Sequence, residues 1–321
     1  MTAKPQHLFS PPDTPFTPVA LTTNFEAGDF VDYKENFRVV ELLGRGRFGT
    51  VYECEDLSQK KKRVAVKLDL KGKALKQEHK IYMILRDNPS SLIATPSYVG
   101  YNEKRSPFYI VISLEGKNFA RIIGDVPQKI EPKQLSALAW YGLQAIEILH
   151  KLRIVHRDVR MENMCLSKTP GKLKVVAIDF GYSDTSTIDQ KTKRRIYPEQ
   201  GKKKFFKAPY ASVRVHEKHP VTEVDDLHSF VYMLIDMCRG WDHFDKTPEV
   251  MLAKKKELMG NVKQTLKPSE HFLVPFIKEV FAQPYDGSLP NHKNLIRIIS
   301  ETPGFDKKAY NLNCKETTNF F

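Results

Sequence analysis

The fold of this chain is decided by the stretch Ile154-Val155-His156-Arg157-Asp158-Val159-Arg160-Met161-Glu162-Asn163. An apolar pair leads into a charged run, and an asparagine stands five residues beyond the aspartate. Asp179-Phe180-Gly181 follows, with Asp179 21 residues after Asp158 and directly behind the strand-like run that ends at Ile178. Either motif alone is weak evidence. Their occurrence together in this order indicates one site built from both segments.

Upstream, Gly44-Arg45-Gly46-Arg47-Phe48-Gly49-Thr50-Val51 fits the pattern GxGxxGxV. Glycines let a backbone fold tightly over phosphate groups and point its N–H groups at them. The same glycine spacing occurs at dinucleotide sites, where a strand leads into a helix. Here β-rich sequence both precedes and follows the glycines, which disfavours the dinucleotide interpretation.

Lys67 ends the apolar run Val64-Ala65-Val66. A buried ammonium group needs a partner, because an isolated charge is costly to remove from water. Glu78 is the only glutamate between Lys67 and Leu85, so it is the natural partner. In isolation, the simpler interpretation is a lysine at a strand end whose ammonium group reaches solvent.

The spacing of apolar residues predicts a small sheet-rich part followed by a larger helical part. Strands are predicted over 37–44, 50–56, 63–70, 97–101 and 108–112. Helices are predicted over 74–85, 134–152 and 225–240, with further amphipathic segments to about residue 299. We therefore predict an α+β chain of two lobes, joined by a short connection near 114–117.

The ordered set of motifs resembles the eukaryotic protein kinase family from about Phe37 to Ile299. Tyr210-Ala211-Ser212-Val213 stands where that family has Ala-Pro-Glu, and Leu114-Glu115-Gly116-Lys117-Asn118-Phe119 lies at the lobe connection. These runs are similar to the casein kinase 1 superfamily, particularly its tau-tubulin kinase branch. The resemblance implies a bilobal protein-kinase fold over 31–310, with a mostly-β N-lobe over about 35–113 and a larger α-helical C-lobe over about 117–305.

The resemblance also implies roles for individual residues, with ATP and Mg²⁺ as cofactors. Asp158 would accept or orient the proton of a substrate hydroxyl, assisted by Arg160 and Asn163. Asp179 and Asn163 would supply oxygen ligands to Mg²⁺. The residues implied for ATP binding are Leu43, Gly44, Gly46, Gly49, Val51, Ala65, Lys67, Glu78, Ile112, Leu114, Cys165 and Ile178. For the apolar members of this set, core packing is the simpler alternative. Asp226 is expected to brace the backbone of residues 156–163, which the resemblance makes the catalytic loop.

Two departures from the family pattern bear on activity. Arg160 replaces a lysine that contacts the γ-phosphate, so a planar guanidinium group replaces a compact ammonium group. Some tyrosine kinases carry arginine here, which slightly favours tyrosine as an acceptor. Lys207 replaces a threonine that positions the acceptor hydroxyl, and Pro209 replaces a basic residue that helps hold a phosphorylated substrate. If Lys207 paired with Asp158, it would lower the aspartate pKa and block the site.

Three functional hypotheses follow. The first is an active serine/threonine kinase, and the second is a pseudokinase that binds nucleotide and acts as a scaffold. The third is a basic nucleic-acid-binding protein, which we disfavour because no nucleic-acid module is visible.

The chain of 321 residues carries 51 lysines and arginines against 38 carboxylates, a formal charge of +13. Part of this excess lies between residues 182 and 210, which contain eight basic residues and three acidic residues. The simpler interpretation is a solvated loop. The functional one is a guide for acidic or phosphorylated protein substrates.

The remaining features describe the setting of the domain. Five prolines with few large apolar residues predict a disordered arm over 1–30, and residues 306–321 read as a short polar tail. The four cysteines show no CxxC spacing, which favours reduced thiols and an intracellular, cytoplasmic or nuclear location. No membrane span or secretory signal is visible. We expect a monomer.

Overall fold

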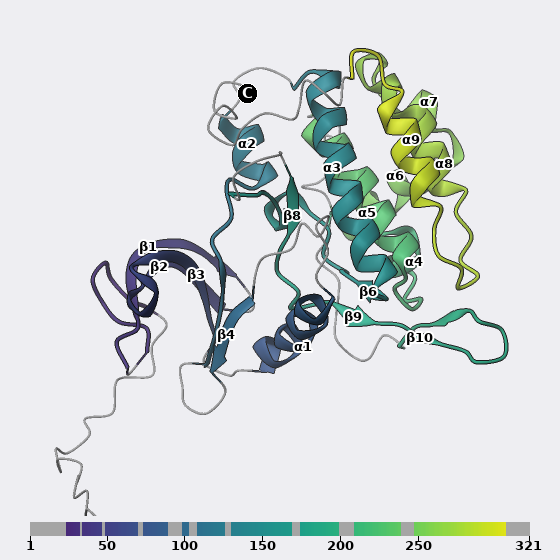
Figure 1. The fold of residues 1–321 in the computed structure, drawn as a ribbon. Coiled ribbons are helices and arrows are strands. Elements are labelled where there is room, and N and C mark those ends of the chain that lie inside the picture. The colour runs from purple at the N-terminus through teal and green to yellow at the C-terminus, as the bar shows by residue number, and fades with distance from the viewer. Residues whose placement is uncertain are drawn as a thin grey trace, which may run out of the picture.

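The computed structural model describes residues 24–32, 34–46, 49–69, 73–88, 98–102, 108–125, 130–168, 174–198, 209–238 and 247–305. Within these residues a small lobe built on one sheet is followed by a larger lobe of helices (Figure 1). The bilobal α+β architecture predicted from the sequence is therefore confirmed. None of the helices in this part of the chain is long and apolar enough to cross a membrane.

The small lobe is a five-stranded antiparallel sheet with one helix against it. Its elements are β1 (Phe37–Gly46), β2 (Gly49–Asp56), η1 (Leu57–Gln59), β3 (Lys62–Asp69), α1 (Lys73–Asp87), β4 (Tyr98–Asn102) and β5 (Phe108–Ser113). The strand order is β1-β2-β3-β5-β4. Burial alternates residue by residue along β2, whereas five successive residues of the central strand β3 are buried. The central position of β3 explains why Lys67 lies inside the lobe.

Apolar side chains cover both faces of this sheet. One cluster consists of Val31, Val39, Tyr52, Cys54, Val64, Val66, Leu68 and Val111. On the other face, Ile110 of β5 joins Leu75, Ile81 and Tyr82 of α1 in a core that continues into the helical lobe. Because this core is shared, α1 packs with both lobes.

The large lobe is mostly helical and also carries short pairs of antiparallel strands. Its elements are α2 (Phe119–Asp125), α3 (Pro132–Lys151), β6 (Ile154–Val155), η2 (Met161–Asn163), β7 (Met164–Leu166), β8 (Val175–Ala177), β9 (Asp184–Thr185), β10 (Thr187–Ile188), β11 (Arg195–Ile196), α4 (Val213–His216), α5 (Glu223–Met237), α6 (Pro248–Gly260), α7 (Val262–Thr265), η3 (Pro268–Leu273), α8 (Val274–Phe281) and α9 (His292–Ser300). The apolar character of α5 on nearly all sides predicts a buried helix, and 13 of its 15 residues are buried.

The start of the described chain differs from the predicted disordered arm. The N–H of Gly28 donates to Val39 at 2.9 Å, and the N–H of Val39 donates to Asp29 at 2.8 Å. The ring of Phe25 meets that of Tyr52 edge-on, with centroids 5.9 Å apart. All five prolines that motivated the prediction precede Asn24, so the composition argument does not extend to residues 24–30. The rest of the predicted arm, and the predicted tail over 306–321, lie outside the described residues.

This contact gives the first prediction. Phe25→Ala should lower the free energy of unfolding by about 1–3 kcal/mol, because it removes the packing against Tyr52. Leu57→Ala is the matched control, since Leu57 is 38% exposed and should change stability by less than about 0.5 kcal/mol. Chemical denaturation measures both. Equal effects of the two substitutions would show that the packing of the Phe25 ring against Tyr52 contributes nothing to stability.

Candidate active site

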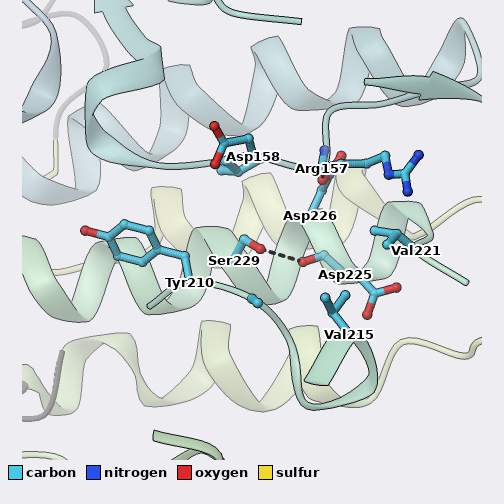
Figure 2. Close-up of a pocket in the computed structure, with 10 residues that line it drawn as sticks. Arg157, Asp158, Tyr210, Val215, Val221, Asp225, Asp226 and Ser229 are labelled. Carbon is cyan, nitrogen blue, oxygen red and sulfur yellow. Dashed lines mark hydrogen bonds between the residues drawn. The ribbon is translucent and has the colours of Figure 1, made fainter. Parts of the chain in front are cut away.

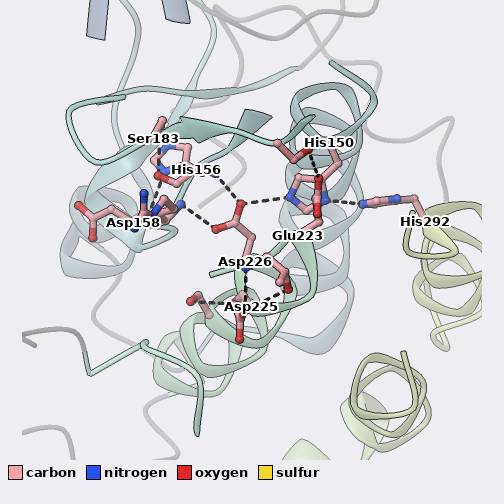
Figure 3. A network of polar contacts seen from close by, with 12 residues as sticks. His150, His156, Asp158, Ser183, Glu223, Asp225, Asp226 and His292 are labelled. Atoms are coloured by element: carbon pink, nitrogen blue, oxygen red, sulfur yellow. Dashed lines mark hydrogen bonds and ion pairs between the residues drawn. The ribbon is translucent and has the colours of Figure 1, made fainter. Parts of the chain in front are cut away.

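The loop after β6 is held by one buried carboxylate. Asp226, in the first turn of α5, accepts the N–H of His156 at 2.6 Å and the N–H of Arg157 at 2.8 Å (Figure 3). Both contacts are to the backbone, so the carboxylate sets the path of the chain that leads to Asp158. The expected bracing by Asp226 is therefore confirmed as a structural contact.

Asp158 lies at the end of this braced segment, beside Asn163 of η2. The side-chain amide of Asn163 donates to the Asp158 carbonyl at 2.9 Å and to its carboxylate Oδ2 at 3.0 Å. Burial raises the pKa of Asp158 to about 6, although the charge of Arg160 and the hydrogen bond from Asn163 act in the opposite direction. The carboxylate is thus oriented by a neighbour and made more basic than an exposed aspartate.

The ammonium group of Lys67 lies between two carboxylates. Its Nζ is 2.8 Å from Glu78 Oε2 and 2.7 Å from Asp179 Oδ1, while the Lys67 side chain is only 9% exposed. Burial lowers the pKa of Lys67, but the charges of Glu78 and Asp179 outweigh burial, so the pKa rises and the lysine stays charged. The pairing of Lys67 with Glu78 inferred from the sequence is present. Asp179 is the additional partner.

Glu78 also fixes the segment that carries Asp179. Its second oxygen, Oε1, accepts the N–H of Phe180 at 3.3 Å. The Phe180 ring is fully buried and meets Tyr82 of α1 edge-on at a centroid distance of 5.2 Å. On its other side Phe180 packs against His156, with centroids 5.3 Å apart. These contacts bring α1, the catalytic loop and the Asp179 segment into one assembly.

The three glycines of the first motif differ in what their backbone requires. Gly49 has φ +128°, and a Cβ there would lie 1.8 Å from the carbonyl oxygen of Leu68, so only glycine fits against β3. A Cβ at Gly44 or Gly46 would meet nothing within 4 Å in the described chain. Packing inside the described protein therefore explains Gly49, whereas Gly44 and Gly46 leave room beside the backbone. Arg47 and Phe48 lie outside the described residues.

The apolar residues assigned to adenine come from several elements. Ala65 and Ile112 are register partners on β3 and β5, and Cys165 of β7 bridges to Asn118 just after the lobe connection. Leu43 is 42% exposed. Ile178 packs partly against the apolar cluster of α3 and β8. Val51 and Leu114 are partly buried. Their grouping as an adenine slot stays a prediction.

Arg160 has a partner that the sequence analysis did not anticipate. Its guanidinium group forms two hydrogen bonds of 2.7 Å with the carboxylate of Glu162. A contact between Arg160 and a γ-phosphate would have to compete with this pair. The hypothetical ion pair of Lys207 with Asp158 lies outside the described residues.

The basic segment before Tyr210 is less available than its charge count suggests. Arg195 is inserted into the lobe, where it pairs with the buried Glu223 and donates to the His150 carbonyl at 2.7 Å. Arg194 pairs with Asp286 at 2.9 Å. Interpreting all eight basic side chains as free charge is therefore wrong for these two. Lys191 and Lys193 are exposed, and Lys202, Lys203, Lys204 and Lys207 lie outside the described residues.

A small pocket opens beneath the catalytic loop next to Asp158 (Figure 2). Its lining residues are Arg157, Asp158, Val159, Tyr210, Ala211, Val215, Val221, Asp225, Asp226 and Ser229. Buried Lys255 of α6 supports this wall from behind, because its ammonium group donates to the Ala211 carbonyl at 2.6 Å. The same Nζ lies 3.2 Å from His216 Nε2 and 4.8 Å from the centre of the Tyr232 ring. These three contacts are with neutral groups, and burial lowers the Lys255 pKa to about 7.

The oxygen donors at Asn163 and Asp179 suit a hard cation. The Asn163 side chain uses its amide nitrogen to hold Asp158, so its amide oxygen is the atom that would bind a cation. Lys67 and Gly181 both donate to Oδ1 of Asp179. The described residues hold no cluster of three or more histidine, cysteine or carboxylate side chains suited to a metal. One carboxylate and one amide fit Mg²⁺, which takes its other ligands from water and phosphate.

Comparisons with known proteins match most of this chain. The family described as Protein kinase domain matches residues 37–304. A Caenorhabditis elegans protein named as a serine/threonine-protein kinase is 26% identical over 234 residues, which are 69% of this chain and 66% of that protein. The serine/threonine-protein kinase CLA4 of Candida albicans is 31% identical over 216 residues, which are 65% of this chain and 21% of that protein. The chain thus spans about two thirds of the first relative and about a fifth of the second.

The buried lysine behind the pocket gives a prediction on pH and stability. The folded-state pKa of Lys255 is lower than the unfolded value, so the unfolded chain binds more protons and stability must rise with pH. Relative to Lys255→Met, the wild type should gain about 1–3 kcal/mol of unfolding free energy between pH 7 and pH 9.

Lys256→Met is the matched control, because its side chain is 55% exposed and pairs with Glu217 at the surface. It should follow the wild type across the whole pH range. Urea denaturation at several pH values measures the differences. A constant difference between wild type and Lys255→Met would contradict the low pKa of the buried lysine.

Proposed function

The chain belongs to the protein kinase family, and on this basis we propose that it transfers the γ-phosphate of ATP to serine or threonine hydroxyl groups of other proteins. The observation that carries the proposal is the position of Lys67, whose ammonium group is shared by Glu78 and Asp179 at 2.8 and 2.7 Å. A buried charge held between two carboxylates of opposite lobes is costly to assemble, and it suits the binding of phosphate oxygens.

In the proposed reaction Asp158 acts on the acceptor hydroxyl. It accepts the hydroxyl proton while the hydroxyl oxygen forms a bond to the γ-phosphorus. The bond from that phosphorus to the oxygen bridging the β- and γ-phosphates breaks, and ADP leaves with the electron pair. The raised pKa of Asp158, about 6, makes it a better proton acceptor than an exposed aspartate. Asn163 orients its carboxylate during this step.

Mg²⁺ would be held by Asp179 and Asn163 together with ATP. When bound, the cation neutralises negative charge that develops on the phosphate oxygens. Lys67 would hold the α- and β-phosphates, with Glu78 keeping its side chain in place. The glycine segment of β1 and β2 would cover the phosphates, which the open space beside Gly44 and Gly46 permits. The apolar residues around Ala65 and Ile112 would contact the adenine.

The proposed substrates are acidic or phosphorylated proteins. Support comes from the exposed Lys191 and Lys193 in the segment that follows Asp179, and from the overall charge of +13. Arg194 and Arg195 are already paired, so the proposed guide is weaker than the sequence count implies. Placement in the casein kinase 1 superfamily, near its tau-tubulin kinase branch, rests on Tyr210-Ala211-Ser212 and remains part of this proposal. So do the monomeric state and an intracellular location.

A pseudokinase that binds nucleotide is the second candidate, and one contact favours it. The pairing of Arg160 with Glu162 occupies the side chain that stands in place of the family's γ-phosphate lysine. A kinase with this position occupied would bind ATP while transferring phosphate poorly.

Phosphate transfer to a peptide separates the two candidates. With Mg-ATP and an acidic serine peptide, Asp158→Asn should lower kcat by about 10²–10⁴-fold, because the proton acceptor is lost. Asp87→Asn, at an exposed position of α1, is the control and should keep wild-type activity. Wild-type transfer should also be faster to the acidic peptide than to a neutral peptide with the same acceptor.

The same peptide assay also tests whether the departures from the family pattern prevent phosphate transfer. Nucleotide binding without Asp158-dependent transfer would reject the kinase proposal in favour of the scaffold. Lys207→Thr should raise transfer if Lys207 blocks Asp158, and an unchanged or lower rate would exclude that block.

A further inference from the structure

Three buried side chains, His292, His150 and Asp226, form a hydrogen-bonded chain that leads from α9 to the catalytic loop. We call it the histidine–aspartate chain. His292 of α9 and His150 of α3 meet ring to ring, with Nε2 of His292 2.9 Å from Nδ1 of His150. The opposite nitrogen of His150, Nε2, lies 3.1 Å from Oδ2 of Asp226. At the other end, Nδ1 of His292 lies 2.9 Å from the carbonyl oxygen of Pro290. Figure 3 shows the two rings in line with the carboxylate that braces the catalytic loop.

The number of protons in this chain follows from its hydrogen bonds. It contains three contacts, and each requires one proton. A carbonyl oxygen stands at one end and a carboxylate oxygen at the other, and both only accept. Two neutral imidazole rings carry one proton each, which is two in total. All three contacts are satisfied only if the chain holds a third proton. Without it, two lone pairs must face each other inside the protein, which is unfavourable.

Burial decides which group takes the third proton. His150, His292 and Asp226 are each 2% exposed or less. Burial lowers the pKa of both histidines to about 3, because it disfavours the charged ring. It raises the pKa of Asp226 to about 6, because it disfavours the carboxylate. The proton therefore belongs on the Asp226 carboxyl group, which then donates to His150.

Charged groups on the surrounding elements also act on the protonation of His150, His292 and Asp226. Glu223 of α5 and Arg195 of β11 stand beside His150 and form an ion pair with each other. Glu147 and Lys151 of α3 act on His292 with opposite signs and pair with each other at 2.7 Å. His156 and Arg157 of the catalytic loop favour the ionised form of Asp226. The first four charges thus form two mutually compensating pairs. His156 and Arg157 act to lower the pKa of Asp226, so they limit how firmly its carboxyl group holds the proton.

We propose that His292, His150 and Asp226 share one proton beyond those of two neutral rings, and that His292 is a positioning residue for the catalytic loop. His292 acts through His150 and through Asp226, whose two oxygens hold the backbone of His156 and Arg157. The arrangement links the position of α9, 66 residues beyond Asp226 in the sequence, to the loop that carries Asp158.

The proton has a defined effect on the rings. While it is bound, both His150 and His292 carry their ring proton on Nδ1. When it leaves, His150 must move its proton to Nε2 to donate to the carboxylate, and His292 must do the same to donate to His150. The contact of His292 with the Pro290 carbonyl is then lost. This is the least costly break, because that carbonyl also accepts the backbone N–H of His292 at 2.8 Å.

The direction of the pH effect follows from linkage. The folded-state pKa of Asp226 is higher than its unfolded value, so the folded protein binds more protons than the unfolded protein at pH values between the two. The contribution of the histidine–aspartate chain to stability is therefore present at low pH and is lost as pH rises through about 6.

Nuclear magnetic resonance of the full chain with ¹⁵N-labelled histidine tests the proposal directly. Correlations between ring nitrogens and ring carbon-bound protons report which nitrogen carries the proton. The expected result is that both buried rings are protonated on Nδ1 at pH 5 and on Nε2 at pH 8, with one common transition. Rings protonated on Nε2 at every pH from 5 to 8 would overturn the proposal. Rate measurements alone are unsuitable, because the pKa of Asp158 lies in the same range.

A variant pair supplies the second readout. His292→Leu leaves a single contact between His150 and Asp226, which one proton on His150 Nε2 satisfies. In this variant His150 should be protonated on Nε2 at pH 5 as well as at pH 8, and the transition should disappear. His219→Leu, at an exposed position, is the control and should keep the transition. A transition of His150 that persists unchanged in His292→Leu would show that His292 takes no part. If His292→Leu does not fold, the wild-type spectra still decide the proposal.

Discussion

The site depends on one buried cation. Lys67 lies on the central strand of the small sheet, where its side chain is only 9% exposed. A charge in that position is tolerated only with partners, and it has two: Glu78 from α1 and Asp179 from the helical lobe. The requirement for both partners forces α1 against the sheet and the Asp179 segment against α1. The contacts of one ammonium group and the apolar core that the two lobes share thus set the relative placement of the lobes at the site.

A buried carboxyl group plays the same part in the helical lobe. Asp226 holds two backbone N–H groups of the catalytic loop, and its own position is set by the buried helix α5. Phe180 links the two centres, since it packs against Tyr82 of α1 and against His156 of the loop. Asp158, the proposed proton acceptor, and Lys67, the proposed phosphate-binding residue, are therefore positioned by separate carboxyl groups, and Phe180 packs between the segments that carry them.

Sequence reasoning reached the parts of this arrangement that depend on local pattern or on a single possible partner. The strands and main helices followed from periodicity, and Glu78 was the only glutamate available to Lys67. The pairs that were missed join distant segments. His150 and His292 are 142 residues apart, and Arg195 pairs with Glu223 across 28 residues. Composition could not separate Arg195 from the exposed lysines beside it, because only the packed lobe buries it. Residues 24–30 differ from the predicted arm, because Phe25 packs against Tyr52, which lies 27 residues away in the sequence.

The central claim is that Lys67 and Glu78 act as one unit. A double-mutant cycle of Lys67→Met and Glu78→Gln, measured by the free energy of unfolding, tests it most directly. Lys67→Met leaves Glu78 buried without the ammonium group, and Glu78→Gln leaves Lys67 with Asp179 as its one carboxylate, so the two effects should overlap. We predict that the double mutant is about 1–3 kcal/mol more stable than the sum of the single effects implies. Additivity within about 0.5 kcal/mol would contradict the claim that Lys67 and Glu78 act as one unit.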